Sequence, residues 1–424
     1  MALTDHPLRR QVVGEMQLRR FPAFSLPARI VQIMRIVEDR EAETRALRAI
    51  WPELDPAARH AQAQLCAHVT LGWERHSEAS TMTLVTTGED APLDWSPPPE
   101  TVLIEAVPGK VVRASRLLLV ADDAAAQGLI AKAGFGSSHL VTCHVRSPSG
   151  TRARLWTDFR IHADGYGRIV MATGGMPLAD FGRCVQQVQE LGNYRNLALI
   201  GLPEARAAWS ELDALEAELE DIGQGLARGD RRDDTLLASL IALSARLLSI
   251  DSGCGYRMSA TAAYARIVAS RMAQLDAEAI PGFQSLAAFN DRRFEPAVHT
   301  CAALTTRLAL LNARTAQSTA LLRTRIETHI ENQNARLLAS VDRSARMQVR
   351  LQRLVEGLSS VVISYYLLGL IGYPLKAAEH VWPPFHATLA LGLLAPLVIA
   401  LLSILMGRAH RRLDSDDKHP ALGP

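Results

Sequence analysis

Apolar positions concentrate in two runs near the C-terminal end of the chain. Residues 357–375 read GLSSVVISYYLLGLIGYPL and residues 385–406 read FHATLALGLLAPLVIALLSILM, without Asp, Glu, Lys or Arg in either run. A helix needs roughly 20 apolar residues to cross a bilayer, and a charge at its centre costs at least about 2.5 kcal/mol. The pattern therefore predicts two transmembrane helices joined by a short outer loop, residues 376–384. The alternative is a buried helical hairpin in a soluble core.

Basic side chains flank both apolar runs. They are Arg343, Arg346, Arg350 and Arg353 before the first run, and Arg408, Arg411 and Arg412 after the second. Because basic flanks stay on the cytoplasmic side, both termini are expected in the cytoplasm. The sequence thus predicts a multi-pass protein of a bacterial inner membrane. Its tail, residues 407–424, is basic and then polar.

A long helical pattern precedes the first apolar run. Between Ala297 and Gly372 there is no proline, and glycine is absent until Gly357. Leucine and isoleucine recur at helical spacing along this stretch, which predicts a stalk helix over residues 297–356 that continues into the membrane. A helix with so long an apolar stripe needs partners, and this favours coiled-coil packing in a homo-oligomer. A break near residues 331–334, where polar side chains interrupt the stripe, is the alternative.

The region before the stalk, residues 203–296, also has helical periodicity. The apolar stripe runs through Trp209, Leu212, Leu215, Leu219 and Ile222. The glycine-rich, charged stretch GQGLARGDRRDD predicts a turn into a second, antiparallel helix over residues 235–250. A further helix over residues 259–275 is expected after a break at residues 251–253.

The first 202 residues mix helical and strand-like patterns. Pro27 predicts the start of one helix, and residues 56–71 predict another. Short runs of apolar and β-branched residues then predict strands. These runs are residues 81–87, 101–107, 115–121, 139–145, 151–162 and 168–172, and a helix over residues 180–191 follows them. The fold class is therefore an α+β or α/β cytoplasmic domain with a mixed sheet.

Charge and cysteine usage exclude some functions. The 46 Lys and Arg residues nearly balance 44 Asp and Glu residues, and the net charge of +2 gives no support to general nucleic-acid binding. The five cysteines lie far apart, without a CxxC pair, so a zinc site is not expected. No cofactor-binding motif is present: there is no P-loop, no GxGxxG and no HExxH. We expect no cofactor, and the patterns identify no metal site.

Three segments carry a resemblance to a known family. They are WERHSEAST from Trp73, NYRNLALIGLPEAR from Asn193, and RLVEGLSSVVISYYLLGLIGYPLKA from Arg353. They resemble recurrent segments of a bacterial membrane protein family known only as a domain of unknown function. The resemblance covers the whole chain and implies no activity.

The last 130 or so residues also resemble the CorA-type magnesium transporters in architecture. That resemblance implies a pentamer, with the first span lining a pore for a divalent cation. The family's Gly-Met-Asn signature at the outer mouth corresponds to Gly372, Tyr373 and Pro374 here. Proline supplies no side-chain oxygen, and Lys376 beside Glu379 would repel a cation if it faced the mouth. Magnesium selectivity is therefore not carried over.

Polar residues in the first span allow two interpretations. Gln352, Ser359, Tyr366 and Tyr373 recur every seven residues and so share one side of a helix. Such a stripe faces protein or water, so these residues are pore-lining candidates. The alternative is helix packing, for which Ser360, Ser364 and Gly369 are the small residues that admit a close neighbour.

Catalytic patterns are weak. Glu74, Arg75 and His76 lie in a row, which favours a structural Arg/Glu network between helix and sheet. Three residues near a predicted hairpin favour a solvated turn: Asp158, His162 and Asp164. Four acidic residues near the stalk base favour a solvated face over a cation sensor: Asp276, Glu278, Asp291 and Glu295. The sequence therefore predicts a protein that is not an enzyme.

Two functional hypotheses stand nearly level. One is an oligomeric, CorA-like cation channel or transporter with a cytoplasmic gating domain. The other is a membrane-anchored scaffold or regulator, whose cytoplasmic domain binds a protein partner while the spans only tether it to the lipid bilayer. An enzyme built around Glu74, Arg75 and His76 is a distant third.

Overall fold

The computed structural model describes residues 6–9, 12–13, 21–55, 57–88, 93–136, 139–147, 149–381 and 386–416. The chain divides into two compact units, Met1–Ala320 and Leu321–Pro424. Each unit has its own architecture. The finer division predicted at residues 202 and 296 stays a prediction.

The first unit is built on a mixed sheet of nine strands in the order β2-β3-β4-β1-β5-β8-β7-β6-β9. Strands β5 and β8 pair in parallel, whereas the other neighbours are antiparallel. The strands are β1 (Ala28–Ile36), β2 (His60–Cys66), β3 (Val69–Arg75), β4 (Ala79–Thr87), β5 (Lys110–Val120), β6 (Val141–Arg146), β7 (Arg152–Thr157), β8 (Gly167–Ala172) and β9 (Ala277–Ala279). The predicted mixed sheet is confirmed.

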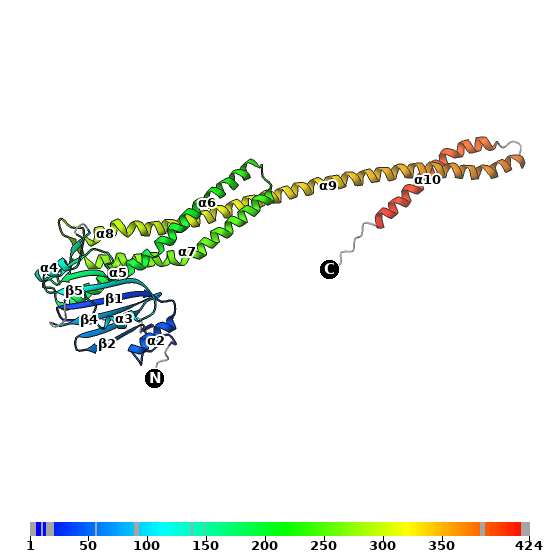
Figure 1. The fold of residues 1–424 in the computed structure, drawn as a ribbon. Helices are drawn as coiled ribbons and strands as arrows, with labels where there is room; N and C mark the ends of the chain where they lie inside the picture. The colour runs from blue at the N-terminus through cyan, green and yellow to red at the C-terminus, as the bar shows by residue number, and fades with distance from the viewer. Residues whose placement is uncertain are drawn as a thin grey trace. The chain divides into compact units, whose positions relative to one another are not determined.

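Helices follow and cover the sheet (Figure 1). The short ones are α2 (Arg40–Ile50), α3 (Thr101–Glu105), α4 (Asp123–Lys132) and α8 (Leu286–Arg293). The long ones are α5 (Leu178–Leu199), α6 (Gly201–Arg228), α7 (Asp233–Leu275), α9 (Glu295–Val381) and α10 (Ala387–Asp416). The predicted order of elements, a mixed-sheet domain followed by long helices, is therefore confirmed.

Alternate side chains of each central strand enter different cores. In β1, Ile30 and Met34 join the core beneath α5, α7 and α8. Val31 and Ile33 point to the opposite face, where they pack with Leu47 of α2 and residues of α3. Because successive strand side chains alternate, one strand supplies both cores. The sheet is the middle layer between α5 with its neighbours and α2, α3 and α4.

Burial on both faces explains why β1 is not the predicted helix. The run ARIVQIMRI has eight buried residues followed by one intermediate residue. Its polar residues Arg29, Gln32 and Arg35 are three positions apart and fall on both faces of the strand, so they give no period-two signal. The strand pairs with β4 along Ala28–Ile36 and with β5 on its other side. The helix predicted from Pro27 was wrong up to Ile36, and the helical part begins only at Arg40.

Three other local predictions were also wrong. Residues 56–71 form no helix, because β2 and the start of β3 pair there as a hairpin. The predicted strand over residues 101–107 is instead the short helix α3. The predicted break at residues 251–253 is absent, because α7 runs unbroken over 43 residues. A helix tolerates isolated glycines at a modest cost when packing of one face holds it.

The predicted antiparallel helix pair is α6 and α7. Gly229, with φ of 68°, ends α6 in the left-handed conformation that glycine adopts freely. Leu212, Leu215 and Leu219 on α6 are buried, as are Leu240 and Leu243 on α7. The first part of α9 joins this pair through ion pairs, since Arg307 contacts Asp213 at 2.6 Å and also Glu216.

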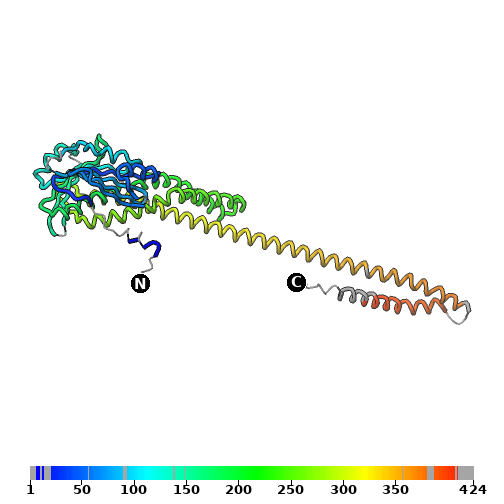
Figure 2. Tube along the Cα trace, turned by 90° about the horizontal axis from the view of Figure 1, so that it is seen from below, coloured from blue at the N-terminus to red at the C-terminus, as the bar shows by residue number. Residues whose placement is uncertain are grey.

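The second unit consists of the rest of α9 and α10. Every residue from 327 to 355 is exposed, and no break interrupts the helix near residues 331–334. Helix α9 passes through Pro374 and ends at Val381, so the first part of the predicted loop 376–384 is helical. Residues 382–385 lie outside the described residues. Figure 2 shows α10 returning alongside α9, and a Cβ on Gly372 would lie 3.3 Å from Leu391.

A close helix crossing in the first unit predicts a stability effect. A Cβ at Gly201 would overlap the Oγ1 of Thr261, which donates a hydrogen bond to the carbonyl of Ala198 at 2.9 Å. We expect Gly201→Ala to lower the free energy of unfolding by about 1–3 kcal/mol, because overpacking forces backbone shifts. Urea unfolding followed by circular dichroism checks this.

The matched control is Gly253→Ala in α7, where no atom lies within 4 Å of the new Cβ. It should raise the free energy of unfolding by about 0.5–1 kcal/mol, because alanine favours the helix. Equal effects of the two substitutions would contradict the assigned crossing.

Candidate functional site

The pore-lining candidates lie on α9 of the second unit. Tyr366 is 68% exposed and Tyr373 is 76% exposed. Gln352 is exposed as well, and Ser359 is partly exposed. These four residues therefore form a stripe of exposed and partly exposed side chains along the helix. Its use as a pore lining stays a prediction.

Small residues face α10 on another side of α9. Ser364 is 1% exposed, and its hydroxyl donates to the carbonyl of Ser360 at 2.7 Å. Gly372 is buried against α10, whereas Gly369 is exposed. Ser360 and Ser364, two of the three packing candidates, are thus less exposed than Gly369, and Gly372, which the sequence placed at the outer mouth, lies next to Leu391 of α10.

The remaining outer-mouth candidates lie near the end of α9. Pro374 is inside the helix, and Lys376 is exposed. The Glu379 carboxylate lies 3.9 Å from His386 at the start of α10. In the part of the chain that the structure describes, no group of three or more His, Cys, Asp or Glu residues could hold a metal ion.

Trp73, Glu74 and Arg75 lie at the end of β3, with His76 just after it, and Trp73 and Arg75 belong to a structural network. Glu43 of α2 is fully buried and accepts a hydrogen bond from Arg40 at 3.0 Å. Arg75 lies 3.7 Å from the same carboxylate, and the indole N–H of Trp73 donates to it at 3.4 Å. The predicted Arg/Glu network between helix and sheet is present, with Glu43 as its acid.

Several of the other acidic candidates lie beside basic side chains. Asp158 contacts His162 at 3.3 Å, and Asp164 contacts Arg116 at 2.7 Å. Near the stalk base, Glu278 pairs with Arg146 and with Arg152. Asp158 is buried, whereas the Asp164 and Glu278 side chains are partly exposed and pair with arginines.

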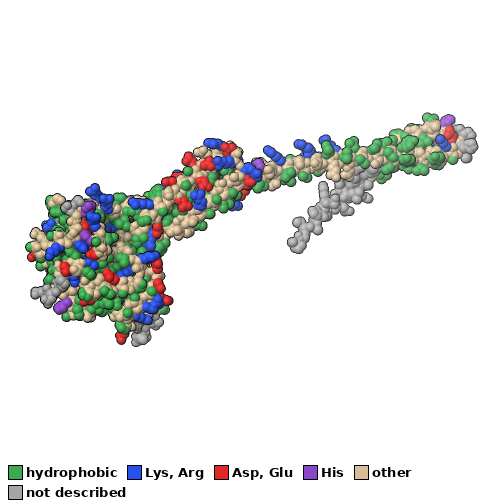
Figure 3. Space-filling model, in the orientation of Figure 1, with side chains coloured by type: hydrophobic (Ala, Val, Ile, Leu, Met, Phe, Trp, Pro, Cys, Tyr) green, Lys and Arg blue, Asp and Glu red, His purple; other side chains and the backbone are tan. Residues whose placement is uncertain are grey.

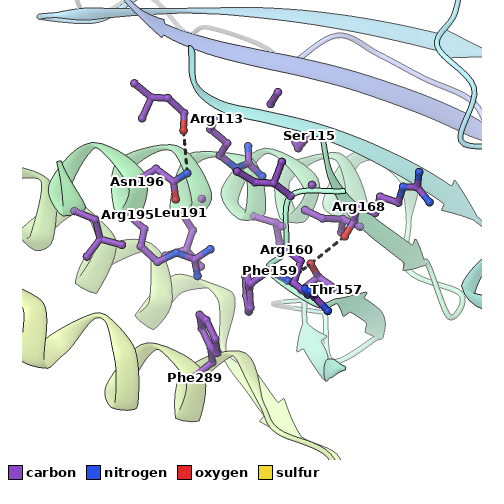
Figure 4. A pocket seen from close by; sticks show the side chains of 18 of the residues that line it. Arg113, Ser115, Thr157, Phe159, Arg160, Arg168, Leu191, Arg195, Asn196 and Phe289 are labelled. Atoms are coloured by element: carbon purple, nitrogen blue, oxygen red, sulfur yellow. Dashed lines mark hydrogen bonds between the residues drawn. The ribbon is translucent and has the colours of Figure 1, made fainter. Parts of the chain in front are cut away.

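A cavity lies between the sheet and helices α5 and α8, and it is the candidate binding site (Figure 4). Its volume is about 320 Å³, at the lower end of the range for small-molecule sites. Strand β5, the segment after β7, strand β8, helix α5 and helix α8 all contribute to its wall. No sequence pattern predicted this site.

Arginines dominate the polar part of the wall. They are Arg113, Arg160, Arg168, Arg195 and Arg293. The lining residues of the cavity include no Asp or Glu. A wall with basic side chains and no acidic ones has a strongly positive potential, because a low-dielectric surround screens charge poorly.

Arg195 is the buried centre of this wall. It is 9% exposed, and burial lowers the pKa of its guanidinium to about 10. Its guanidinium carbon lies 4.3 Å from the ring centre of Phe159 and 5.7 Å from that of Phe289. These two rings stack on each other with centroids 4.1 Å apart. Among the described residues, no side chain forms an ion pair with Arg195.

Arg113 is fixed by neutral partners. Its Nη1 donates to the side-chain oxygen of Asn193 at 2.9 Å and to that of Gln32 at 3.2 Å. Burial, and then the nearby charge of Arg195, lower the pKa of Arg113 to about 9. A Cβ on Gly192 would lie 2.6 Å from the Nε of Arg113, so only glycine leaves room for this guanidinium.

The backbone at Phe159 is strained. Its φ of 53° lies in the left-handed region, where a bulky residue is a genuine outlier. The neighbouring Asp158 caps this turn, because its carboxylate accepts the backbone N–H of Arg160 at 3.2 Å. Such strain concentrates at binding sites, where the surrounding structure holds it.

Sequence reasoning missed the cavity for a physical reason. Arg113, Arg160, Arg195 and Arg293 come from separate elements, so no local spacing joins them. One signal was available: Asn193, Arg195 and Asn196 interrupt the apolar face of a helix that is otherwise buried.

In the part of the chain that the structure describes, three helices are long and apolar enough to cross a membrane: α7, α9 and α10. The family model described as "Protein of unknown function (DUF3422)" matches residues 4–413. A search of curated proteins and a search of solved structures each find no match. The family match therefore covers nearly the whole chain without adding an activity, and the comparisons give no support to a CorA-type relationship.

The Glu43 network yields a stability prediction. We expect Glu43→Ala to lower the free energy of unfolding by about 3 kcal/mol, because it leaves Arg75 and the Trp73 N–H without their buried acceptor. Thermal unfolding followed by circular dichroism checks this. Glu41→Ala is the control on the same helix, since its side chain is 91% exposed. An unchanged melting temperature for Glu43→Ala would contradict the network's structural role.

Proposed function

This chain belongs to the DUF3422 family, and we propose that it is a membrane-anchored regulatory protein. In this proposal the first unit binds its partners in the cytoplasm, and α9 and α10 tether it to the bilayer. The role is one of binding, without catalysis. The proposed location is a bacterial inner membrane.

The contrast between the two units in apolar exposure supports this proposal. In the first unit, Ile30, Met34 and Leu117 are fully buried in a continuous core. In the second unit, Leu393 is 75% exposed and Leu370 is 65% exposed. Figure 3 shows apolar side chains covering the hairpin of α9 and α10, whereas charged side chains are spread over the first unit. A helical hairpin with such exposed leucines is unfavourable in water and favourable in lipid.

We propose two spans, although α7 is a third helix of sufficient length. Helix α7 uses charged contacts with the first unit: Arg246 pairs with Glu218, Arg257 with Glu78, and Arg271 with Glu190. These ion pairs hold α7 on α6, the sheet and α5, where water reaches its exposed face. With two spans and basic flanks, both termini lie in the cytoplasm.

A homo-oligomer is part of the proposal. The exposed stretch of α9 carries apolar residues at heptad spacing: Ile330, Leu337, Leu351 and Leu358 form one row and Met347 and Leu354 the other. Such a pattern is satisfied when helices of several copies pack together. A protein partner in the cytoplasm is also expected, and nucleic acid is not.

A cation channel is the second candidate function. The observation that favours it is the stripe on α9, where Tyr366 and Tyr373 are 68% and 76% exposed. In an oligomer this stripe could line a path for a divalent cation. Loss of ion flux into liposomes with Tyr366→Leu would favour a channel, and unchanged flux would count against it.

Cell fractionation tests the proposed tether. The full chain is expected in the membrane fraction and to resist extraction at alkaline pH, because the apolar hairpin is embedded in lipid. A chain ending at Ala320 is expected in the soluble fraction with a cooperative unfolding transition, because the first unit has its own core.

The orientation control uses reporter fusions that are active only in the cytoplasm, placed at each terminus. Both fusions should be active. A membrane-bound chain 1–320, or a soluble full chain, would contradict the proposal.

A further inference from the structure

We propose that the cavity between the sheet, α5 and α8 binds a small organic anion, with Arg195 and Arg113 as the groups that recognise its carboxylate or phosphate. The inference deepens the proposed regulatory role, on which it rests, by naming the chemistry of a ligand. It follows from three features of the cavity: uncompensated charge, fixed donors and an apolar floor.

The charges of Arg195 and Arg113 have no carboxylate partner among the described residues, whereas Arg168 of the same wall pairs with Asp164 at 3.0 Å. Two other buried arginines of the first unit contact a carboxylate: Arg29 lies 3.1 Å from Asp94, and Arg116 lies 2.7 Å from Asp164. Arg35, which lines no part of this cavity, forms no ion pair among the described residues. Arg195 is 9% exposed, lines the cavity and also has no carboxylate partner among the described residues. Buried charges are normally paired, so an anion from outside would complete this site.

The donors are held in place before any ligand arrives. One face of the Arg195 guanidinium lies against Phe159, which leaves its N–H edges for hydrogen bonds. Arg113 is held by Asn193 and Gln32 through neutral oxygens, so its charge is oriented but not neutralised. A guanidinium fork matches the two oxygens of a carboxylate or phosphate.

The rest of the cavity is apolar. Leu155, Ile169, Val188, Leu191 and Phe294 line it. A free inorganic anion would leave this surface in contact with water, whereas a ligand with an apolar body would cover it. The cavity volume of about 320 Å³ suits a small molecule and excludes a folded polymer. The ligand class is therefore an organic anion with one charged end and one apolar end.

The position of the cavity connects the ligand to the tether. Phe289 and Arg293 of α8 and then Phe294 line the cavity, and α9 begins at the next residue, Glu295. A bound anion would contact the segment from which the long helix starts.

The test measures the melting temperature of the full-length protein in nanodiscs of zwitterionic lipid. The probes are phenyl phosphate and benzoate as soluble anions, decanoate as a lipid-like anion, and benzamide as the neutral analogue. A ligand that binds only the folded state raises the melting temperature in a saturable manner. We expect such a rise with at least one anion and none with benzamide. A response to decanoate alone would identify a lipid-like source, and a response to the aryl anions a soluble one.

Variants assign the effect to the cavity. Arg195→Met should weaken the apparent affinity at least about tenfold, because it removes a buried charge that contacts the ligand. Arg183→Met is the matched control on the same helix, since Arg183 pairs with Asp180 outside the cavity. It should respond like the wild type. If Arg195→Met does not fold, Gly192→Ala replaces it, because the new Cβ displaces the Arg113 guanidinium while keeping its charge.

The proposal is overturned if no anion raises the melting temperature more than benzamide does. It is equally overturned if the variants with an altered cavity respond to the anions as the wild type does. Neither result would change the membrane fractionation of the chain, so failure of the anion site is distinguishable from failure of the tether.

Discussion

The packing of α5 on the sheet is the constraint on which the first unit depends. This one helix buries Phe181, Val185 and Leu191 in the main core and also forms a wall of the cavity. Gly192 allows the Arg113 side chain to lie between β5 and α5, and Asn196 donates to the carbonyl of Val112 at 3.2 Å. Apolar burial therefore sets the distance between helix and sheet, and polar contacts set the register. Both are needed to hold two guanidinium groups in one small cavity.

A second constraint is where each unit places its apolar side chains. The first unit satisfies its apolar side chains internally, while the second leaves Leu393 and Tyr366 exposed. The backbone N–H and C=O groups of a helix hydrogen-bond to each other, so a helical hairpin leaves few backbone groups unpaired in lipid. In the proposed function the same chain combines a binding domain with a membrane anchor, and α9 contributes residues to both units.

The sequence was most informative where apolar residues repeat at helical spacing over many residues. The stripe on α6 and the apolar runs at the C-terminal end predicted helices, because helical spacing repeats there without interruption. The central strand β1 was missed because both of its faces are buried and no alternation remains. The cavity was missed because Arg113 and Arg195 come together only through the pairing of β5 with its neighbours and the packing of α5. Long-range contacts of this kind leave no trace in local spacing.

In the proposed site the charge of Arg195 serves binding and not folding, and the melting temperature of the ligand-free protein tests this directly. A buried cation without a carboxylate costs free energy, so Arg195→Met is predicted to melt at or above the temperature of the wild type, as substitutions of functional residues often do. A melting temperature several degrees lower would show that the arginine holds the fold together, and would contradict the account.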